Sequence, residues 1–268
     1  MTEHKSNIKF QLCNSITEEE ALKLDSNYLA NFKYDGCRII AIKKDEDIIL
    51  LNRRGHICNK QFSEIVDELS TIKIDFMIDG EVISLDDDFE KLQKRALTKD
   101  IIKIKQLQKD IPIKYMIFDI ISWKGLDMKF HRLDERIKGF QNFQNLKHIA
   151  TAEFKPIAEM LKQAKEQDRE GIVIKRMDSY YMGDRNDDWR KCKFFLEEKI
   201  KVIKYTINPK GIRAEDDKGN AVQIAGEQHK EVKEAIDKNG FAEINIQFLD
   251  KTKDNRYRFP SFRQLLIW

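Results

Sequence analysis

The segment 31-NFKYDGCRII-40 places a lysine, an aspartate and an arginine around a single glycine, with apolar residues on both sides. A half-buried strand tolerates such charges only where they meet partners, because an unpaired buried charge is costly. Gly36 permits backbone geometries and close approaches that other residues resist. The segment therefore predicts a turn at which charged side chains converge, although an ordinary surface turn at 34–36 fits the same residues.

Lys33 is a candidate nucleophile at this turn. A lysine attacks only as the unprotonated amine, and desolvation or a cationic neighbour such as Arg38 favours that form. Asp35 opposes this effect if it lies close, but it can orient another group. The spacing of lysine, aspartate, glycine and arginine is a moderately specific signal when taken alone.

The composition indicates a globular protein but does not identify its function. The chain has 268 residues, of which 41% are hydrophobic and 10% aromatic, enough for a sizeable core and two domains. The 49 Lys+Arg nearly cancel the 46 Asp+Glu, so the net charge of +3 indicates little. Between Lys91 and Lys109, however, seven basic residues face one acidic residue. This cluster, with Lys94, Arg95 and Lys99 at its centre, fits a polyanion as well as a solvated helix face.

The cysteines and the N-terminus indicate the cellular compartment. Cys13, Cys37, Cys58 and Cys192 are far apart and form no CxxC pair, which fits neither a zinc site nor a disulfide framework. The start MTEHKSNIKF lacks the apolar core of a signal peptide, and no apolar run of about 18 residues occurs. We therefore expect reduced thiols in a cytoplasmic protein that does not enter a membrane.

Alternating apolar residues and β-branched runs predict strands at 37–44, 47–54, 74–84, 113–121 and 171–176. Helical periodicity predicts helices at 62–72 and 156–167. Strands that alternate with helices and form hairpin-like pairs, without a Rossmann or Walker sequence, predict an α+β fold with antiparallel sheets.

The pattern changes after about Glu197. Four or five short strands and one helix in roughly 70 residues match a small barrel of the OB type. We place a domain boundary near residue 196. The segments concerned are the strands at 198–207, 219–226 and 241–250, the helix at 229–239, and a final strand within 257–268.

Charged residues recur at the ends of the predicted apolar strands. Such charges are costly unless they meet partners, so we predict that they gather in one cleft. The segments are 79-DGE-81, 117-IFDI-120, 170-EGIVIK-175 and 189-WRKCK-193, which carry Glu81, Phe118, Glu170, Lys175, Lys191 and Lys193. Each alone has an ordinary interpretation, as core, exposed ion pair or solvated edge, but the ordered set makes that interpretation hard to sustain.

The ordered set resembles the covalent nucleotidyltransferases, and most closely the small ATP-dependent DNA ligases of viral and bacterial type. The resemblance runs from about Tyr28 to Phe262, and the tail 243-EINIQFLDKTKDNRYRFPSF-262 separates the chain from capping enzymes. It implies an α+β nucleotidyltransferase (adenylylation) domain with ATP-grasp-like antiparallel sheets at 1–196. An OB-fold β-barrel at 197–268 would follow.

The resemblance also implies a reaction. Lys33 would attack the α-phosphate of ATP, release pyrophosphate and carry AMP, while Lys191 and Lys193 neutralise charge on that phosphate. AMP would then pass to a 5′-phosphate at a nick in duplex DNA, and the adjacent 3′-hydroxyl would displace it. The implied cofactors are ATP and Mg²⁺ or Mn²⁺, with Glu81 and Glu170 as metal ligands.

The implied nucleotide contacts come from several segments. Phe118 would stack on adenine and Ile172 would pack on its other face. Glu81 would contact the ribose, and Arg38 and Arg53 would bind phosphate or ribose of the nucleotide or the 5′-phosphate of the nick. The remaining implied nucleotide contacts are Asn31, Phe32, Asp35 and Lys175.

The implied DNA contacts are Arg53, Lys94, Arg95 and Lys99, on a protein expected to act as a monomer in replication, repair or recombination. Three alternatives stay open: an RNA ligase with the same chemistry, a guanylyltransferase, and a ligase-like protein that binds nucleic acid without catalysis.

The end of the chain departs from the family pattern. The family's last segment usually follows FPSF with an arginine and then an Asp-Lys pair, whereas here Leu266 stands at the place of the arginine. Arg263, Arg258 and Lys253 are the candidates to orient pyrophosphate instead.

Overall fold

The computed structural model describes residues 8–252 and 254–267, so the first seven residues, Lys253 and Trp268 lie outside the described part. The chain forms two compact units, the first ending at Cys192 and the second beginning at Lys193. The boundary predicted near residue 196 falls four residues further along, at the start of β12 (Leu196–Asn208).

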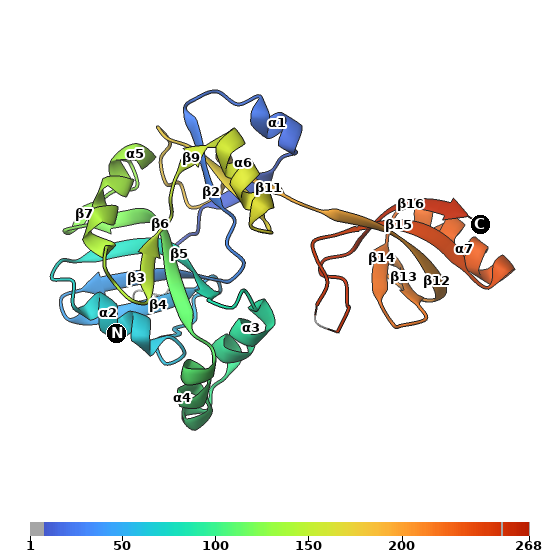
Figure 1. Cartoon of the computed structure of the whole chain (residues 1–268), viewed down its shortest axis with the longest axis horizontal. Coiled ribbons are helices and arrows are strands. Elements are labelled where there is room, and N and C mark those ends of the chain that lie inside the picture. Colours follow the sequence, from blue (N-terminus) through green and yellow to red (C-terminus); the bar gives the residue numbers. More distant parts are fainter. Residues whose placement is uncertain (1–7, 253, 268) are drawn as a thin grey trace. The chain divides into compact units, whose positions relative to one another are not determined.

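The larger sheet of the first unit, which we call sheet B, has the strand order β4-β3-β5-β6-β7, with β8 beside β6 (Figure 1). Neighbours along this order are antiparallel, and only the β6–β8 pair of this sheet is parallel. The strands are β3 (Cys37–Lys44), β4 (Asp47–Asn52), β5 (Phe76–Ser84), β6 (Ile113–Trp123), β7 (Leu126–Asp127) and β8 (Ile149–Thr151).

The second sheet of this unit, sheet A, has the order β1-β11-β10-β2-β9. Its β1–β11 pair is parallel, which the expectation of antiparallel sheets did not include. The strands are β1 (Leu12–Ser15), β2 (Tyr28–Phe32), β9 (Lys155–Pro156), β10 (Gly171–Arg176) and β11 (Arg185–Lys193).

The segment 31–40 connects the two sheets. It ends β2 of sheet A at Phe32 and begins β3 of sheet B at Cys37. A Cβ atom on Gly36 would lie 2.1 Å from the carbonyl oxygen of Val82, so only glycine lets the chain pass this close to β5. The predicted turn is therefore the crossover between the sheets.

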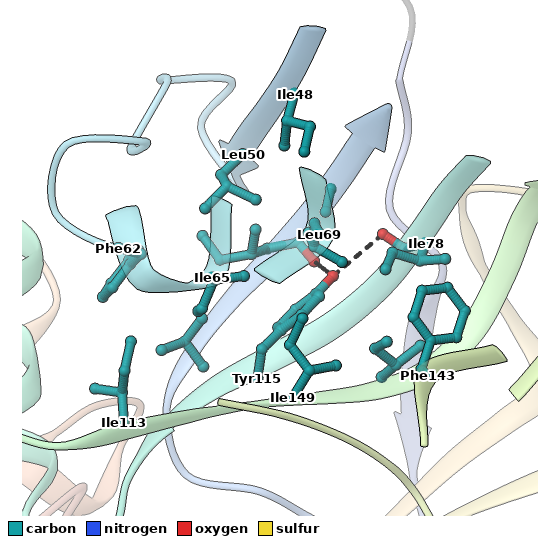
Figure 2. Packing of buried hydrophobic residues seen from close by; sticks show 14 of the residues in the cluster. Ile48, Leu50, Phe62, Ile65, Leu69, Ile78, Ile113, Tyr115, Phe143 and Ile149 are labelled. Carbon is teal, nitrogen blue, oxygen red and sulfur yellow. Dashed lines mark hydrogen bonds between the residues drawn. The ribbon is translucent and has the colours of Figure 1, made fainter. Parts of the chain in front are cut away.

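Sheet B separates a hydrophobic core from the side on which the charged residues lie. Ile39 and Ala41 of β3 pack into the core, which α2 (Ser63–Ser70) covers, whereas Ile40 between them joins a second cluster on the other face. Figure 2 shows the hydroxyl of Tyr115 within this core, where it lies 3.0 Å from the carbonyl oxygen of Ile39. Alternate side chains of β3 therefore point to opposite faces of sheet B, one toward the hydrophobic core and the other toward the charged residues.

The helices of the first unit lie between the strands along the chain. The predicted helices at 62–72 and 156–167 correspond to α2 and α6 within two residues at each end, and Pro156 is the N-cap residue rather than part of the first turn. The basic cluster forms two consecutive helices, α3 and α4 (Figure 1). The remaining helical bounds are α1 (Glu18–Leu22), α3 (Phe89–Leu97), α4 (Ile101–Asp110), α5 (Leu133–Arg136), η1 (Ile137–Phe143) and α6 (Ile157–Glu166).

The second unit is a five-stranded antiparallel sheet of order β14-β13-β12-β15-β16, with α7 (Gln228–Asn239) between β14 and β15 along the chain. Val232, Ala235 and Ile236 of α7 pack into the core of the sheet. Sequence patterns missed β13, and the final strand begins at Ser261 rather than near residue 257. The remaining bounds are β13 (Gly211–Asp216), β14 (Ala221–Ile224), β15 (Ala242–Phe248) and β16 (Ser261–Ile267).

The structure also bears on the expectations for membrane insertion and for the cysteines. Within residues 8–252 and 254–267, no helix combines the length and the apolar character needed to span a membrane. The four cysteines carry free thiols.

Arg95 was predicted to contact DNA together with the other residues of the basic cluster, and this prediction is wrong. The side chain of Arg95 is fully buried and donates hydrogen bonds to the carbonyl oxygen of Gln61 at 2.8 and 2.9 Å and to that of Ile111 at 2.7 Å. It also pairs with Glu64. The guanidinium therefore ties α2, α3 and the end of α4 together, and it cannot reach DNA without leaving these partners. Lys94 and Lys99 are exposed.

We predict that Arg95→Ala lowers the free energy of unfolding by about 3 kcal/mol, because it leaves two buried carbonyl groups and a carboxylate without their donor. Lys94→Ala, one residue away and exposed, is the matched control and should change stability by less than about 0.5 kcal/mol. Urea unfolding followed by circular dichroism measures both. Equal small effects for the two variants would contradict the structural role of Arg95.

Candidate functional site

Lys33 lies at the end of β2, where the chain leaves sheet A. Its backbone N–H donates to the carbonyl oxygen of Gly171 at 2.9 Å, which aligns it with the start of β10. Its amine lies 2.5 Å from a carboxylate oxygen of Glu170, and 22% of the Lys33 side chain is exposed. The predicted nucleophile and the predicted metal ligand are thus direct neighbours, and solvent still reaches the amine.

Arg38 and Asp79 form a buried ion pair on the facing sheet. The guanidinium of Arg38 donates to both carboxylate oxygens of Asp79, at 3.1 and 2.6 Å, and Asp79 is fully buried. Burial opposes the charged form of Arg38, but the carboxylate outweighs it and raises the pKa of Arg38 above its usual value. Arg38 also lies within 5.2 to 5.7 Å of three aromatic ring centres. It is therefore a permanently charged group held in place.

Glu81 lies beside this pair, opposite Arg38 in the β3–β5 register. Burial raises the pKa of Glu81 to about 8, while Lys33 and Arg38 act in the lowering direction and Asp35 adds to the rise. The predicted residues Lys33, Asp35, Arg38 and Glu81 are hence close enough to influence one another electrostatically.

Lys175 is the most enclosed lysine of the site. Its amine donates to the backbone carbonyl of Phe118 at 2.8 Å, and only 1% of the residue is exposed. It lies 3.7 Å from the ring centre of Trp189 and 4.5 Å from that of Phe118. Burial lowers the pKa of Lys175 to about 7, although the carboxylates of Asp119 and Asp79 oppose the shift.

Phe118, predicted to stack on adenine, and Ile172, predicted to pack on its other face, are both buried. Phe118 is 7% exposed, with Arg38 and Lys175 against its ring and Trp189 edge-on to it, and Ile172 is fully buried. Phe118 faces the site rather than the core of sheet B, as stacking requires. Two cations already lie close to this ring, and the stacking role stays a prediction.

Asn31 leaves a buried acceptor unsatisfied. Its amide nitrogen donates to the carbonyl oxygen of Phe32 at 2.7 Å, and Asn31 is 1% exposed. Its Oδ1 atom has no hydrogen-bond partner among the described residues. Buried polar atoms are almost always paired in native proteins, so this oxygen indicates a place for a donor from a ligand.

Cys13 of β1 marks the point where the basic side chains converge. Burial raises the pKa of its thiol, while four cations act in the opposite direction: Arg38, Lys175, Lys191 and Lys33. Lys191 on β11 is adjacent to β1, where it pairs in register with Ser15. Three lysines of the predicted site and Arg38 therefore lie near enough to Cys13 to act on its thiol.

Lys193 and the C-terminal candidates belong to the second unit. Lys193 lies 5.4 Å from the ring centre of Phe259, and Arg258 pairs with Asp250 at 2.9 Å. Arg263 is exposed on β16. Their part in nucleotide chemistry stays a prediction.

Arg53 is exposed in the turn that follows β4. The last residue of β4, Asn52, pairs with Ile39, next to Arg38 on β3. Arg53 therefore lies beyond the same end of sheet B as Arg38, without joining the buried cluster in the described structure.

The acidic residues suit a divalent cation that is shared with a substrate. Within the described part of the chain, no group of three or more His, Cys, Asp or Glu side chains could hold a metal by itself. Mg²⁺ is commonly held by one or two carboxylates plus substrate phosphates and water. Glu170, beside Lys33, fits that kind of site. Burial favours the protonated form of Glu81, so this carboxyl would have to release its proton to bind the cation.

Sequence reasoning missed several residues that the structure places at the site: Phe10, Gln11, Cys13 and Tyr181. Gln11 N–H donates to the hydroxyl of Tyr181 across 170 positions of sequence. No local sequence pattern predicts a contact between residues this far apart. For Tyr181, the only available signal is an aromatic residue in the short connection between two site strands.

Comparisons with known proteins identify the family of the chain. The family model described as "ATP dependent DNA ligase domain" matches residues 10–193. A prophage-derived DNA ligase-like protein of Bacillus subtilis, LigB, is 29% identical over 261 residues, which cover 89% of this chain and 92% of that protein. A DNA ligase of Thermococcus onnurineus is 25% identical over 201 residues, covering 69% of this chain but only 35% of its own length.

Solved ligase structures share the fold. A Lig E DNA ligase, whose DNA binding is described as using a minimal scaffold, superposes with a TM-score of 0.71 at 19% identity, covering 97% of this chain and all of that chain. The ligase domain of M. tuberculosis LigD gives a TM-score of 0.61 at 19% identity, covering 97% of this chain and 95% of the other. These matches confirm the predicted nucleotidyltransferase fold followed by an OB domain.

The burial of Lys175 generates a prediction about pH. Its pKa of about 7 in the folded protein lies below the unfolded value of about 10.4, so the unfolded chain binds more protons between these values. Its contribution to the free energy of unfolding should therefore rise as pH increases from about 7 to 9. Lys175→Met removes the titrating group, so the free energy of unfolding of the wild type minus that of this variant should become more positive as pH rises, as measured by urea unfolding. Lys44→Met, at an exposed position, should leave the difference flat.

Proposed function

Because the chain belongs to the ATP-dependent DNA ligase family, whose members are ligase enzymes, we propose that it seals 5′-phosphate/3′-hydroxyl nicks in duplex DNA through a lysyl-AMP intermediate. The observation that carries the proposal is the Lys33–Glu170 contact of 2.5 Å at the crossover between two sheets, with Arg38 and Glu81 nearby. An amine, two carboxylates and a fixed cation in one place suit phosphoryl transfer better than they suit binding alone.

In the first step the Lys33 amine attacks the α-phosphorus of ATP. A P–N bond forms, and the bond from the α-phosphorus to the pyrophosphate oxygen breaks. The attack requires the amine to lose a proton, and the carboxylate of Glu170 is the nearest acceptor in the structure. Lys191 and Arg38, which converge near Cys13, would neutralise charge on the phosphate oxygens.

The unsatisfied oxygen of Asn31 supports ATP over GTP. Adenine presents an amino group, a donor, where guanine presents a carbonyl, an acceptor. The amide of Asn31 is oriented by its bond to the carbonyl oxygen of Phe32, which leaves Oδ1 as an acceptor. The amino group of adenine would complete its hydrogen bonding, whereas the carbonyl of guanine at the same position would not, and a buried site rejects an analogue that leaves such a group unpaired.

In the remaining steps AMP moves from Lys33 to the 5′-phosphate of the nick, and the adjacent 3′-hydroxyl then displaces AMP. Each displacement places negative charge on phosphate oxygens, which Arg38 and Arg53 would bind from the same end of sheet B. Mg²⁺, held by Glu81 and Glu170, would polarise the phosphate when bound. One copy of the chain suffices for these three steps, which fits a monomer that acts in the cytoplasm.

Exposed cations on the first unit would grip the duplex. Arg53, Lys94 and Lys99 are exposed, whereas Arg95 is committed to the fold. Contacts of this kind bind the phosphate backbone without reading sequence, and they release counterions.

We predict that Lys33→Ala abolishes the mass increase of one AMP that the protein acquires on incubation with ATP, because the attacking atom is gone. Intact-protein mass spectrometry measures the adduct. Lys44→Ala, which removes an exposed lysine of β3, is the control and should become adenylylated normally. An AMP adduct that forms on Lys33→Ala at the wild-type rate would refute the nucleophile assignment.

A second prediction concerns DNA binding. Replacing Lys94 and Lys99 together with alanine should weaken binding to a nicked duplex and reduce the slope of log K against log salt by about 1.8, since each phosphate contact contributes about 0.9. Fluorescence anisotropy across a salt series measures the slope. The control replaces two other exposed lysines, Lys138 and Lys162. A slope that is unchanged in the Lys94/Lys99 variant would show that these lysines only coat the surface.

A further inference from the structure

Asp79 is the most constrained acid of the site. Two of its acceptor positions receive the guanidinium of Arg38, at 3.1 and 2.6 Å. A third receives the hydroxyl of Tyr181, at 2.7 Å. Asp79 is fully buried and Tyr181 is 3% exposed, so water does not compete for these bonds.

The direction of the Tyr181 hydrogen bond is determined by its second partner. The backbone N–H of Gln11 points at the same hydroxyl oxygen, at 3.1 Å. A backbone N–H can only donate, so the single proton of the hydroxyl is directed at Asp79. Burial, and then the charge of Asp79, raise the pKa of Tyr181 well above its ordinary value, which keeps that proton in place.

The segment that carries Tyr181, residues 177–184 between β10 and β11, is itself held at several points. Tyr181 N–H donates to the carbonyl oxygen of Lys129 at 2.9 Å. The side-chain oxygen of Gln11 accepts from the N–H groups of Met182 and Gly183, at 2.9 and 3.0 Å. Gln11 therefore binds the segment through its side chain and the hydroxyl through its backbone, which fixes the phenol relative to sheet B.

We propose that Tyr181 is a positioning residue, which, anchored by Gln11, holds the carboxylate of Asp79 so that Arg38 presents its guanidinium to phosphate in one orientation. The proposal rests on the proposed function for the role of Arg38 itself. Its physical basis is that the terminal torsion of an aspartate is soft. With Arg38 as sole partner, both groups can turn together, whereas the hydroxyl of Tyr181 fixes the plane of the carboxylate and hence that of the guanidinium.

The first test is physical and does not depend on activity. Tyr181→Phe keeps the ring, which packs edge-on against Trp189 at 6.0 Å, and removes only the hydroxyl. Hydrogen exchange of the Arg38 Nε–H, followed by NMR in ¹⁵N-labelled protein and identified by its loss in Arg38→Lys, should accelerate about tenfold or more. Tyr180→Phe removes a hydroxyl from the neighbouring, half-exposed residue and should leave the exchange rate unchanged.

The second test is a double-mutant cycle on single-turnover rates. Lysyl-AMP formation, AMP transfer to the nick and strand closure are each measured for wild type, Tyr181→Phe, Arg38→Lys and the double variant. Tyr181→Phe should slow, by about 10- to 100-fold, the same step that Arg38→Lys slows. The double variant should be no slower than Arg38→Lys, because Tyr181 acts only through Arg38.

The outcomes distinguish the positioning role of Tyr181 from the proposed phosphate-binding role of Arg38. An unchanged Arg38 exchange rate in Tyr181→Phe, or rate effects that multiply in the double variant, would overturn the positioning role. Faster exchange in Tyr181→Phe, with every step unaffected by Arg38→Lys, would support the Tyr181–Asp79–Arg38 linkage and refute the proposed phosphate-binding role of Arg38.

Discussion

The site depends on one buried ion pair, Arg38 with Asp79. Removing two charges from water costs more than their attraction returns unless the geometry is good and the remaining acceptors are filled. Here the pair is bidentate, the hydroxyl of Tyr181 fills a further acceptor position, and aromatic rings surround the guanidinium. Sheet B can therefore place a permanent positive charge a short way from its hydrophobic core. That charge acts in the lowering direction on the pKa of Glu81 and of the Cys13 thiol, although burial raises both.

Two lysines of the site show why burial alone does not identify a nucleophile. Lys175 has its pKa lowered to about 7 by burial, which makes its amine the more easily neutralised. Yet its amine is enclosed by the rings of Trp189 and Phe118 and bonded to a carbonyl oxygen, with 1% of the residue exposed. Lys33 keeps 22% of its side chain exposed beside Glu170. Solvent reaches the amine of Lys33 but not that of Lys175, so access favours Lys33 as the proposed nucleophile.

The sequence predicted the site strands well because their signals are local. Alternation along β3 and the acids within β5 are visible within ten residues, and the structure brings Lys33, Arg38, Glu81 and Glu170 together. The prediction that Arg95 contacts DNA was wrong, because it counted the basic residues of the cluster without asking which face of the helix each one occupies. Arg95 lies three residues after the buried Leu92, on the same face of α3, and this spacing was the available signal. Gln11 and Tyr181 were missed for another reason: their contact joins distant segments, and only the assembled sheets reveal it.

The spacing of 33-KYDGCR-38 follows from the crossover it makes. Lys33 must end a strand of sheet A to lie beside Glu170, and Arg38 must begin a strand of sheet B to reach Asp79. The intervening chain has to pass the carbonyl oxygen of Val82 so closely that a Cβ atom at Gly36 would clash. A longer connection would remove the clash, but it would also let the two sheets shift relative to each other. Lys33 and Arg38, the proposed nucleophile and the proposed phosphate-binding cation, therefore stay in register because the connection is short, and glycine is the residue that makes this short connection possible.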